Sequence, residues 1–210
     1  IGLVLLALVL AMAASADMLY PRDPLSLAGR PLQWPFATDR FLLGTDASGR
    51  DIAAQIFHGA RISLLIGFVA TLVAIALGIV VGAVAGYYGG WVDNLLMRVT
   101  EFFQVLPALL FAMVLVTLFS PSLFTVAMAI GVVSWPQTAR LTRAEFLKIK
   151  ELEYVTAARA IGARNKRIIW KVILPNALPP LIVSATLTIG VAILFEAGLS
   201  FLGLGDPNQM

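Results

Sequence analysis

Residues 153–180 read EYVTAARAIGARNKRIIWKVILPNALPP, a basic stretch centred on a glycine and set between two long apolar runs. Residues 152–161 predict a short helix, and Gly162 suits the position after its end, which favours a positive φ. Residues 165–172 predict a second helix, which Leu174 and Pro175 end. The stretch therefore predicts a structured helix-turn-helix and not a plain connector.

The two predicted helices differ in their side chains. Ala157, Ala158 and Ala160 make the first one slim, so it can enter a groove on another protein. The second has an apolar side opposite a basic side, which is typical of an amphipathic helix. Two other interpretations stay open on pattern alone: a basic helix resting on anionic lipid, and a run of Lys and Arg that only fixes the topology.

The composition places the whole chain in a membrane. Apolar residues make up 60% of the sequence and charged residues 13%, and the mean hydropathy is +0.91. The apolar blocks have the length that a helix needs to cross about 30 Å of hydrocarbon, and they lack the alternation of membrane strands. We therefore expect an all-α, polytopic helical bundle with five spans: residues 2–18, 62–87, 99–119, 122–135 with some continuation, and 178–202.

The positions of Lys and Arg set the expected orientation. Residues 138–175 hold nine of the fifteen basic side chains against three acids, whereas residues 19–61 hold five Arg and four Asp. Because cytoplasmic loops retain basic residues, the first segment is expected inside and the second outside. The expected division is a first span at 1–18, an extracytoplasmic segment at 19–61, and a transmembrane domain at 62–210 that includes a cytoplasmic loop at 138–177.

Both ends of the sequence suggest further chain. The first apolar block begins at Ile1 without a basic flank, so an upstream segment is expected. The alternative is a secretory signal peptide, since residues 14–16 read Ala-Ser-Ala, like a cleavage site. The turn-forming residues 203–210 end abruptly.

The second predicted span carries a face of small residues. They recur every fourth position: Ala70, Ala74, Gly78, Gly82 and Gly86. Such a face lets two membrane helices approach closely, although chance enrichment of Gly and Ala in membrane helices is the alternative. Pro107, in the third predicted span, predicts a kink.

Five blocks, in the same order, resemble the permeases of ABC importers, more narrowly the C-type subunit of the dipeptide, oligopeptide and nickel group. Residues 156–183, TAARAIGARNKRIIWKVILPNALPPLIV, resemble the EAA loop of that family. The other blocks are LGTDASGRDI from Leu43, GARISLLIG from Gly59, GYYGGWVDNLLMR from Gly86 and EAGLSFLGLG from Glu196. The sequence departs from the family at Thr156, where Glu is usual; Glu153, about one turn earlier, is an alternative acid.

The resemblance implies the type I fold of importer permeases, with five spans visible and a sixth missing. It implies the plasma membrane of a prokaryote, a second permease subunit, two cytoplasmic ATPase subunits that bind ATP and Mg, and an external substrate-binding protein, with no cofactor in this subunit. It also implies that a coupling helix docks into the ATPase. The residues expected there are Glu153, Tyr154, Thr156, Ala157, Ala158, Arg159, Gly162, Ala163, Leu174 and Pro175.

Few other residues predict chemistry. Glu196, a carboxyl group in the last span, and Gly198 are candidates for the pathway or an outer gate, although a role of Glu196 in holding an interfacial turn is favoured. His58 is the only histidine and is not expected to bind a metal. Asp46 and Asp51 fail the calcium-loop spacing and predict an Asx turn and a helix cap.

The expected function is that of a non-catalytic permease subunit for di- or oligopeptides. The chain has no GxxxxGK[ST] motif, so ATP is expected to be hydrolysed by partners, and no catalytic or metal-binding cluster or nucleic-acid partner is expected. A permease for nickel or another small solute is the alternative within the family. An integral membrane enzyme or a scaffold is the alternative from another class.

Overall fold

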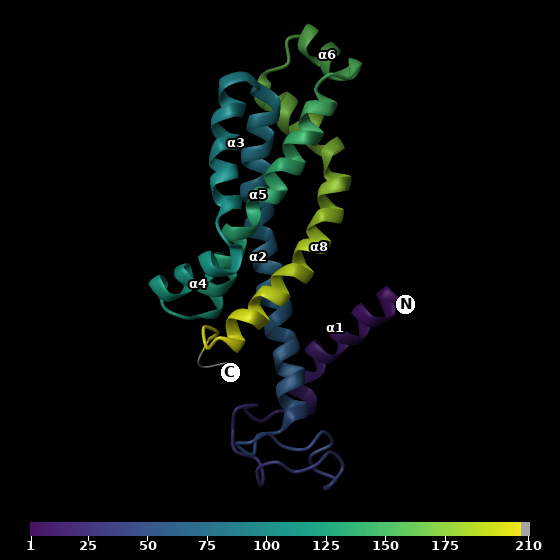
Figure 1. The fold of residues 1–210 in the computed structure, drawn as a ribbon. Helices are drawn as coiled ribbons and strands as arrows, with labels where there is room; N and C mark the ends of the chain where they lie inside the picture. The colour runs from purple at the N-terminus through teal and green to yellow at the C-terminus, as the bar shows by residue number, and fades with distance from the viewer. Residues whose placement is uncertain (207–210) are drawn as a thin grey trace. The chain divides into compact units, whose positions relative to one another are not determined.

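The computed structural model describes residues 1–206, which form helices joined by short connections and one longer loop (Figure 1). Within this range there is no strand, only an isolated bridge between Thr45 and Asp51, so the all-α prediction is confirmed. The helical elements are α1 (Gly2–Leu19), α2 (Ile52–Tyr88), α3 (Gly90–Val105), α4 (Ala108–Phe119), α5 (Leu123–Ile149), α6 (Glu153–Ala160), α7 (Asn165–Arg167), the π-helix η1 (Ile168–Ile173) and α8 (Leu174–Phe201).

The described residues divide into two compact units. One comprises Ile1–Leu65 with Asp206, and the other comprises Ile66–Gly205. The division falls inside α2, so the two units share one helix. The C-terminal turn predicted at 203–210 extends past the described residues; its described part includes Gly203, which has a φ of +77°.

Two aspartates organise the loop of the first unit. Asp46 Oδ1 accepts hydrogen bonds from the backbone N–H groups of Ser48 and Arg50, both at 2.8 Å. Asp51 Oδ1 accepts one from the N–H of Ala53 at 2.9 Å, in the first turn of α2. The predicted Asx turn and helix cap are therefore confirmed. Because of this cap, α2 begins at Ile52, ten residues before the predicted start of the second span.

The Asx turn at Asp46 has a defined pH dependence. Burial alone raises the pKa of Asp46, but the N–H groups of Arg50 and Ser48 and the side chain of Gln55 outweigh it, so the pKa lies below its ordinary value of 3.8. A carboxylate with a depressed folded-state pKa stabilises the fold above its unfolded pKa and loses that contribution as pH falls through the folded value. We expect hydrogen-exchange protection of the Ser48 and Arg50 amides to be present at pH 7 and to be lost only as pH falls below 3.8, through the lower folded-state pKa of Asp46, while amides in the middle of α2 stay protected. Protection of the Ser48 and Arg50 amides that is as strong well below pH 3.8 as at pH 7 would contradict this expectation.

In the second unit α5 is the central helix, and it contacts α3, α4 and α8. Its buried residues form a long stripe that ends with Thr138, Thr142, Phe146 and Ile149. Figure 1 shows α3 beside α2, with α6 beyond the ends of these helices. A core of buried apolar side chains joins α2 and α5 to α6, η1 and α8.

The third predicted span has wrong boundaries, and the fourth continues past residue 135 as expected. Residues 99–119 are not one kinked helix: α3 and α4 meet at 88°. Leu106 is extended (φ −70°, ψ +131°) because Pro107 follows it and disfavours the helical conformation there. The fourth predicted span, 122–135, lies in α5, which continues to Ile149. The start of the predicted loop 138–177, up to that residue, is therefore helix.

The number of spans also differs from the expected five. Among the described residues, three helices are long and apolar enough to cross a membrane: Gly2–Leu19, Ile52–Tyr88 and Asn165–Phe201. A fourth results if α3 and α4 count as one broken span. α5 is not among them, because Gln137, Arg140 and Arg143 make its second half polar.

Leu174 and Pro175 do not end the second helix of the basic stretch, which was a wrong prediction. The chain stays helical from Asn165 to Phe201, through α7, η1 and α8. Pro175 lies in the first turn of α8, which follows the π-helix. A widened turn offers one way to accommodate a residue without an N–H group.

Candidate functional site

Helix α6 is built from local signals. It starts after extended Leu152, has Glu153 in its first turn and Arg159 in its last, and both charges suit the helix dipole. Gly162 follows its end with a φ of +81°. The N–H of Ala163 bonds to the carbonyl of Ala158 at 3.1 Å, and that of Gly162 to the carbonyl of Arg159 at 2.9 Å. These are the two bonds of a Schellman cap, so the predicted helix and its glycine end are confirmed.

Most of α6 faces away from the unit that carries it. Val155, with no exposed surface, is its only buried residue. Tyr154, Thr156, Ala157 and Arg159 are exposed, and Ala158 is half-buried. Ile161, directly after the helix, keeps 86% of its surface exposed. A slim helix with exposed Tyr and Ile side chains beside alanines has the composition of a surface that a partner covers.

The buried side of α6 packs into a core that α2, α5, η1 and α8 share. Val155 belongs to a core cluster that includes Phe146 of α5, Ile168 and Ile173 of η1, and Ala177 of α8. Ala163, Val172 and Leu174 are partly buried against this cluster, whereas Pro175 is exposed. The predicted coupling residues thus include an exposed set on α6, the partly buried residues Ala163 and Leu174 against the core, and exposed Pro175.

Tyr87, at the end of α2, ties both halves of the basic stretch to the bundle. Its hydroxyl donates a hydrogen bond to Asn165 Oδ1 at 2.9 Å. The guanidinium of Arg159 lies over its ring, 5.5 Å from the centroid. One aromatic side chain therefore contacts both α6 and the start of α7.

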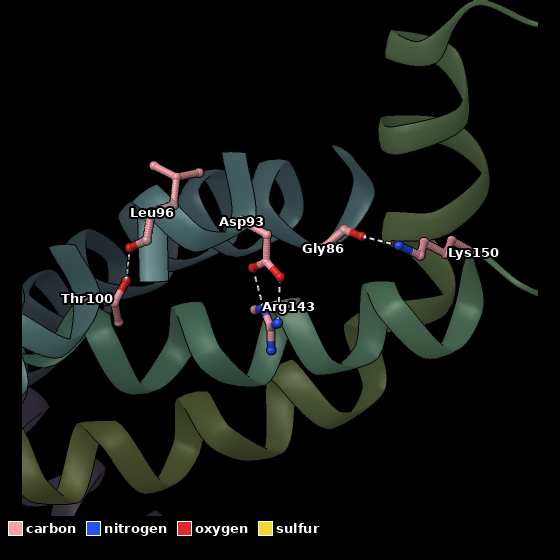
Figure 2. A network of polar contacts seen from close by, with 6 residues as sticks. All are labelled: Gly86, Asp93, Leu96, Thr100, Arg143 and Lys150. Carbon is pink, nitrogen blue, oxygen red and sulfur yellow. Dashed lines mark hydrogen bonds and ion pairs between the residues drawn. The ribbon is translucent and has the colours of Figure 1, made fainter. Parts of the chain in front are cut away.

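Polar contacts join α3 and α2 to α5 (Figure 2). Arg143 of α5 and Asp93 of α3 form a two-pronged ion pair, with Nε to Oδ1 at 2.5 Å and Nη2 to Oδ2 at 2.6 Å. Lys150 Nζ, at the end of α5, donates to the carbonyl of Gly86 at 3.1 Å. Bidentate pairing fixes the relative orientation of the two helices as well as their distance.

The small face of α2 lies against α5. A Cβ atom added to Gly78 would lie 2.5 Å from Thr138 Cβ, and one added to Gly86 would lie 2.6 Å from Phe146 Cβ. One added to Gly82 would overlap the carbonyl oxygen of Ala139. Ala70 and Ala74 are buried on the same helix. The two backbones approach so closely that side chains are excluded at these positions.

Glu196 and Gly198 lie near the end of α8, far along the helix from α6. Glu196 is buried and accepts a hydrogen bond from Ser200 Oγ at 2.8 Å. A Cβ atom at Gly198 would make only an ordinary contact with Leu109 of α4. These contacts are structural, and the gate remains a prediction.

No group of three or more metal-ligating side chains occurs within residues 1–206. A ring nitrogen of His58 lies 3.0 Å from the carbonyl oxygen of Tyr20, a local contact within the first unit.

Sequence reasoning missed Tyr87, Asp93, Arg143 and Lys150. Asp93 was visible as an isolated acid in the block GYYGGWVDNLLMR, and a buried acid needs a partner. Which of the many basic residues pairs with it depends on how α3 and α5 pack, and this is not a local signal.

The comparisons agree with this architecture. The family described as "Binding-protein-dependent transport system inner membrane component" matches residues 78–208. The MetNI methionine ABC transporter, in an inward-facing conformation, has a similar fold, with a TM-score of 0.64, 23% identity, and coverage of 74% of this chain and 77% of that one.

Two curated relatives match more closely in sequence. The dipeptide transport system permease protein DppC of Alkalihalophilus pseudofirmus is 44% identical over 85% of this chain, which spans 58% of that protein. The oligopeptide transport system permease protein OppC of Bacillus subtilis is 36% identical over the whole chain, which spans 68% of that protein. The chain thus belongs to the family of inner membrane components of binding-protein-dependent transport systems.

Proposed function

We propose that this chain is a permease subunit of an ATP-driven importer and forms part of a pathway for di- or oligopeptides that an external binding protein delivers. One observation carries the proposal: α6 is exposed along its length, yet its one buried side chain lies in the core that joins α2, α5 and α8. A partner that moves α6 therefore moves the membrane helices with it. The names of the peptide permeases DppC and OppC support the choice of cargo.

The proposed assembly has a second permease subunit and two cytoplasmic ATPase subunits, which bind ATP and Mg and dock on α6. Residues 138–177 then lie in or next to the cytoplasm, and 19–61 outside. Thr156, exposed on α6, offers a hydroxyl where the EAA pattern has a carboxylate, and exposed Glu153 supplies the acid one turn earlier. The subunit itself carries out no chemistry in this scheme; it changes between inward-open and outward-open arrangements.

The test uses the cap of α6. In the full-length protein, assembled with its partners in proteoliposomes, we expect ATP-dependent uptake of a labelled dipeptide. Gly162→Val is expected to lower uptake and coupled ATP hydrolysis about 5- to 30-fold, because a left-handed conformation costs a residue with a Cβ about 1–2 kcal/mol. Gly162→Asn is the matched control and retains most activity, since Asn tolerates a positive φ.

The outcomes separate the parts of the proposal. ATP-driven uptake of Ni²⁺ without dipeptide uptake would replace peptide by metal as cargo. No ATP-dependent uptake of either by the wild-type assembly would contradict the importer. Equal activity of the Val and Asn variants, with normal uptake, would show that the geometry of α6 plays no part in coupling.

A further inference from the structure

A second site lies in the same unit, away from α6. A pocket of about 380 Å³ opens where the junction of α3 and α4 meets the middle of α5 and of α8. Its apolar wall includes Phe103, Leu187 and Phe195. Its polar side chains are Gln104, Ser134, Gln137, Ser184 and Thr188.

These polar side chains come from positions that share a helix face. Ser134 and Gln137 are three residues apart on α5, and Ser184 and Thr188 are four apart on α8. Ser184 and Thr188 lie in a helix of membrane-spanning length and composition. Polar groups there are costly against lipid, so they normally face a protein or a water-filled space.

Several of these groups are available to a ligand. Within residues 1–206, no hydrogen bond engages the side chains of Ser134, Gln137 or Ser184. Gln104 Oε1 accepts from Arg140 Nη1 at 3.0 Å, which leaves its amide hydrogens free to donate. Thr188 Oγ1 donates to the carbonyl of Ser184 at 2.9 Å and can still accept.

The chemistry of the pocket fits a peptide backbone. It offers amide and hydroxyl groups that both donate and accept, beside an apolar wall, and no charged side chain lines it. A peptide bond has one donor and one acceptor, whatever side chains it carries. Ni²⁺ needs imidazole, thiolate or carboxylate ligands, and the pocket has none. A pocket without charge also repels neither end of a short peptide.

We propose that this pocket contacts the backbone of the peptide during its passage, through Gln104, Ser134, Gln137, Ser184 and Thr188. The inference rests on the proposed function and adds to it the side chains that meet the cargo. Recognition of backbone amides by uncharged groups allows peptides of different sequence to pass. The competing occupant is the second permease subunit, which would seal the pocket in the assembled complex.

Cysteine labelling tests this, because the 210 residues include no cysteine. Ser134→Cys and Ser184→Cys introduce small thiols in the pocket of the full-length, assembled transporter. Thr186→Cys is the matched control: Thr186 is an exposed hydroxyl residue on α8 that does not line the pocket. We expect the two pocket thiols to react with a charged methanethiosulfonate, and alanyl-alanine supplied during ATP turnover to slow that reaction about fivefold or more. The peptide does not change the labelling rate of the Thr186→Cys variant.

A transport measurement complements the labelling. Gln137→Leu keeps the size of the side chain but removes its hydrogen-bonding groups, and it is expected to raise the KM for alanyl-alanine uptake about 2- to 10-fold per lost hydrogen bond. Thr186→Val, the control, leaves the KM at the wild-type value.

Each outcome decides between the alternatives. Pocket thiols that react but are not protected by the peptide would overturn the inference, and so would thiols that never react, because the pocket is then sealed by the partner. An unchanged KM in Gln137→Leu with normal wild-type uptake would also count against it. If the wild-type assembly imports no peptide at all, the proposed function itself fails.

Discussion

Gly82→Ala is expected to lower the free energy of unfolding of the second unit, Ile66–Gly205, by about 3 kcal/mol. This is the upper range for inserting atoms into a packed core. The added methyl group would overlap the carbonyl oxygen of Ala139, and two more atoms of α5, Thr142 Cβ and the Arg143 nitrogen, lie at 2.6 and 3.0 Å. The nearest atom belongs to the backbone, so it cannot rotate away. The helices must separate, and the contacts along α2 and α5 weaken with them.

The matched control is the same chemical change on another helix. A Cβ at Gly190 of α8 meets no atom within 4 Å, so Gly190→Ala is expected to be neutral or to stabilise by up to about 1 kcal/mol through helix propensity. Thermal unfolding of the full-length protein in detergent measures both. If the two substitutions change the melting temperature equally, the close approach of α2 and α5 is not a major source of stability.

The second large effect concerns Asp93. Asp93→Leu leaves the Arg143 guanidinium without its carboxylate, and the side chain of Arg143 is 34% exposed while that of Asp93 is 12% exposed. Breaking a fully buried pair costs about 3–5 kcal/mol; because water reaches Arg143, we expect about 2–3 kcal/mol. Replacing both residues, as Asp93→Leu with Arg143→Met, recovers most of this loss, since no unpaired charge remains.

An exposed pair nearby serves as the control. Arg98 and Glu101 lie 3.4 Å apart, with side chains 83% and 60% exposed. Glu101→Leu should change stability by less than about 1 kcal/mol. The measurement is chemical unfolding of the detergent-solubilised protein. A double variant as unstable as Asp93→Leu alone would show that the bidentate geometry, and not the orphaned charge, sets the cost.

Local signals in the sequence predicted the parts of the fold that depend on few neighbouring residues. The small residues at every fourth position of α2 indicated a close helix contact, and Gly162 indicated the end of α6, because each depends on backbone geometry at that position. The partner of the α2 face was not visible. The buried residues Thr138, Thr142 and Phe146 recur every fourth position on α5, and this period was the available signal that the helix runs into the basic segment.

Other features could not be read locally. The ion pair of Asp93 and Arg143 joins residues 50 positions apart, so it depends on how α3 and α5 pack. Pro175 predicts a helix end, because a proline in a helix interior usually breaks the helix. The preceding π-helix changes the bonding pattern, and that rearrangement has no signature in composition. The pocket exists only where three separate segments meet.

The uninterrupted helix from Asn165 to Phe201 has a mechanical consequence. Its 37 residues span about 55 Å at 1.5 Å per residue. The N-terminal end of this helix is anchored in the core that also holds Val155 of α6. A tilt of about 5° at that anchor displaces the far end by about 5 Å and Ser184, about 28 Å along, by half as much. If a partner moves α6 as proposed, the resulting displacement is small at the core, intermediate at the pocket, and largest beside Glu196.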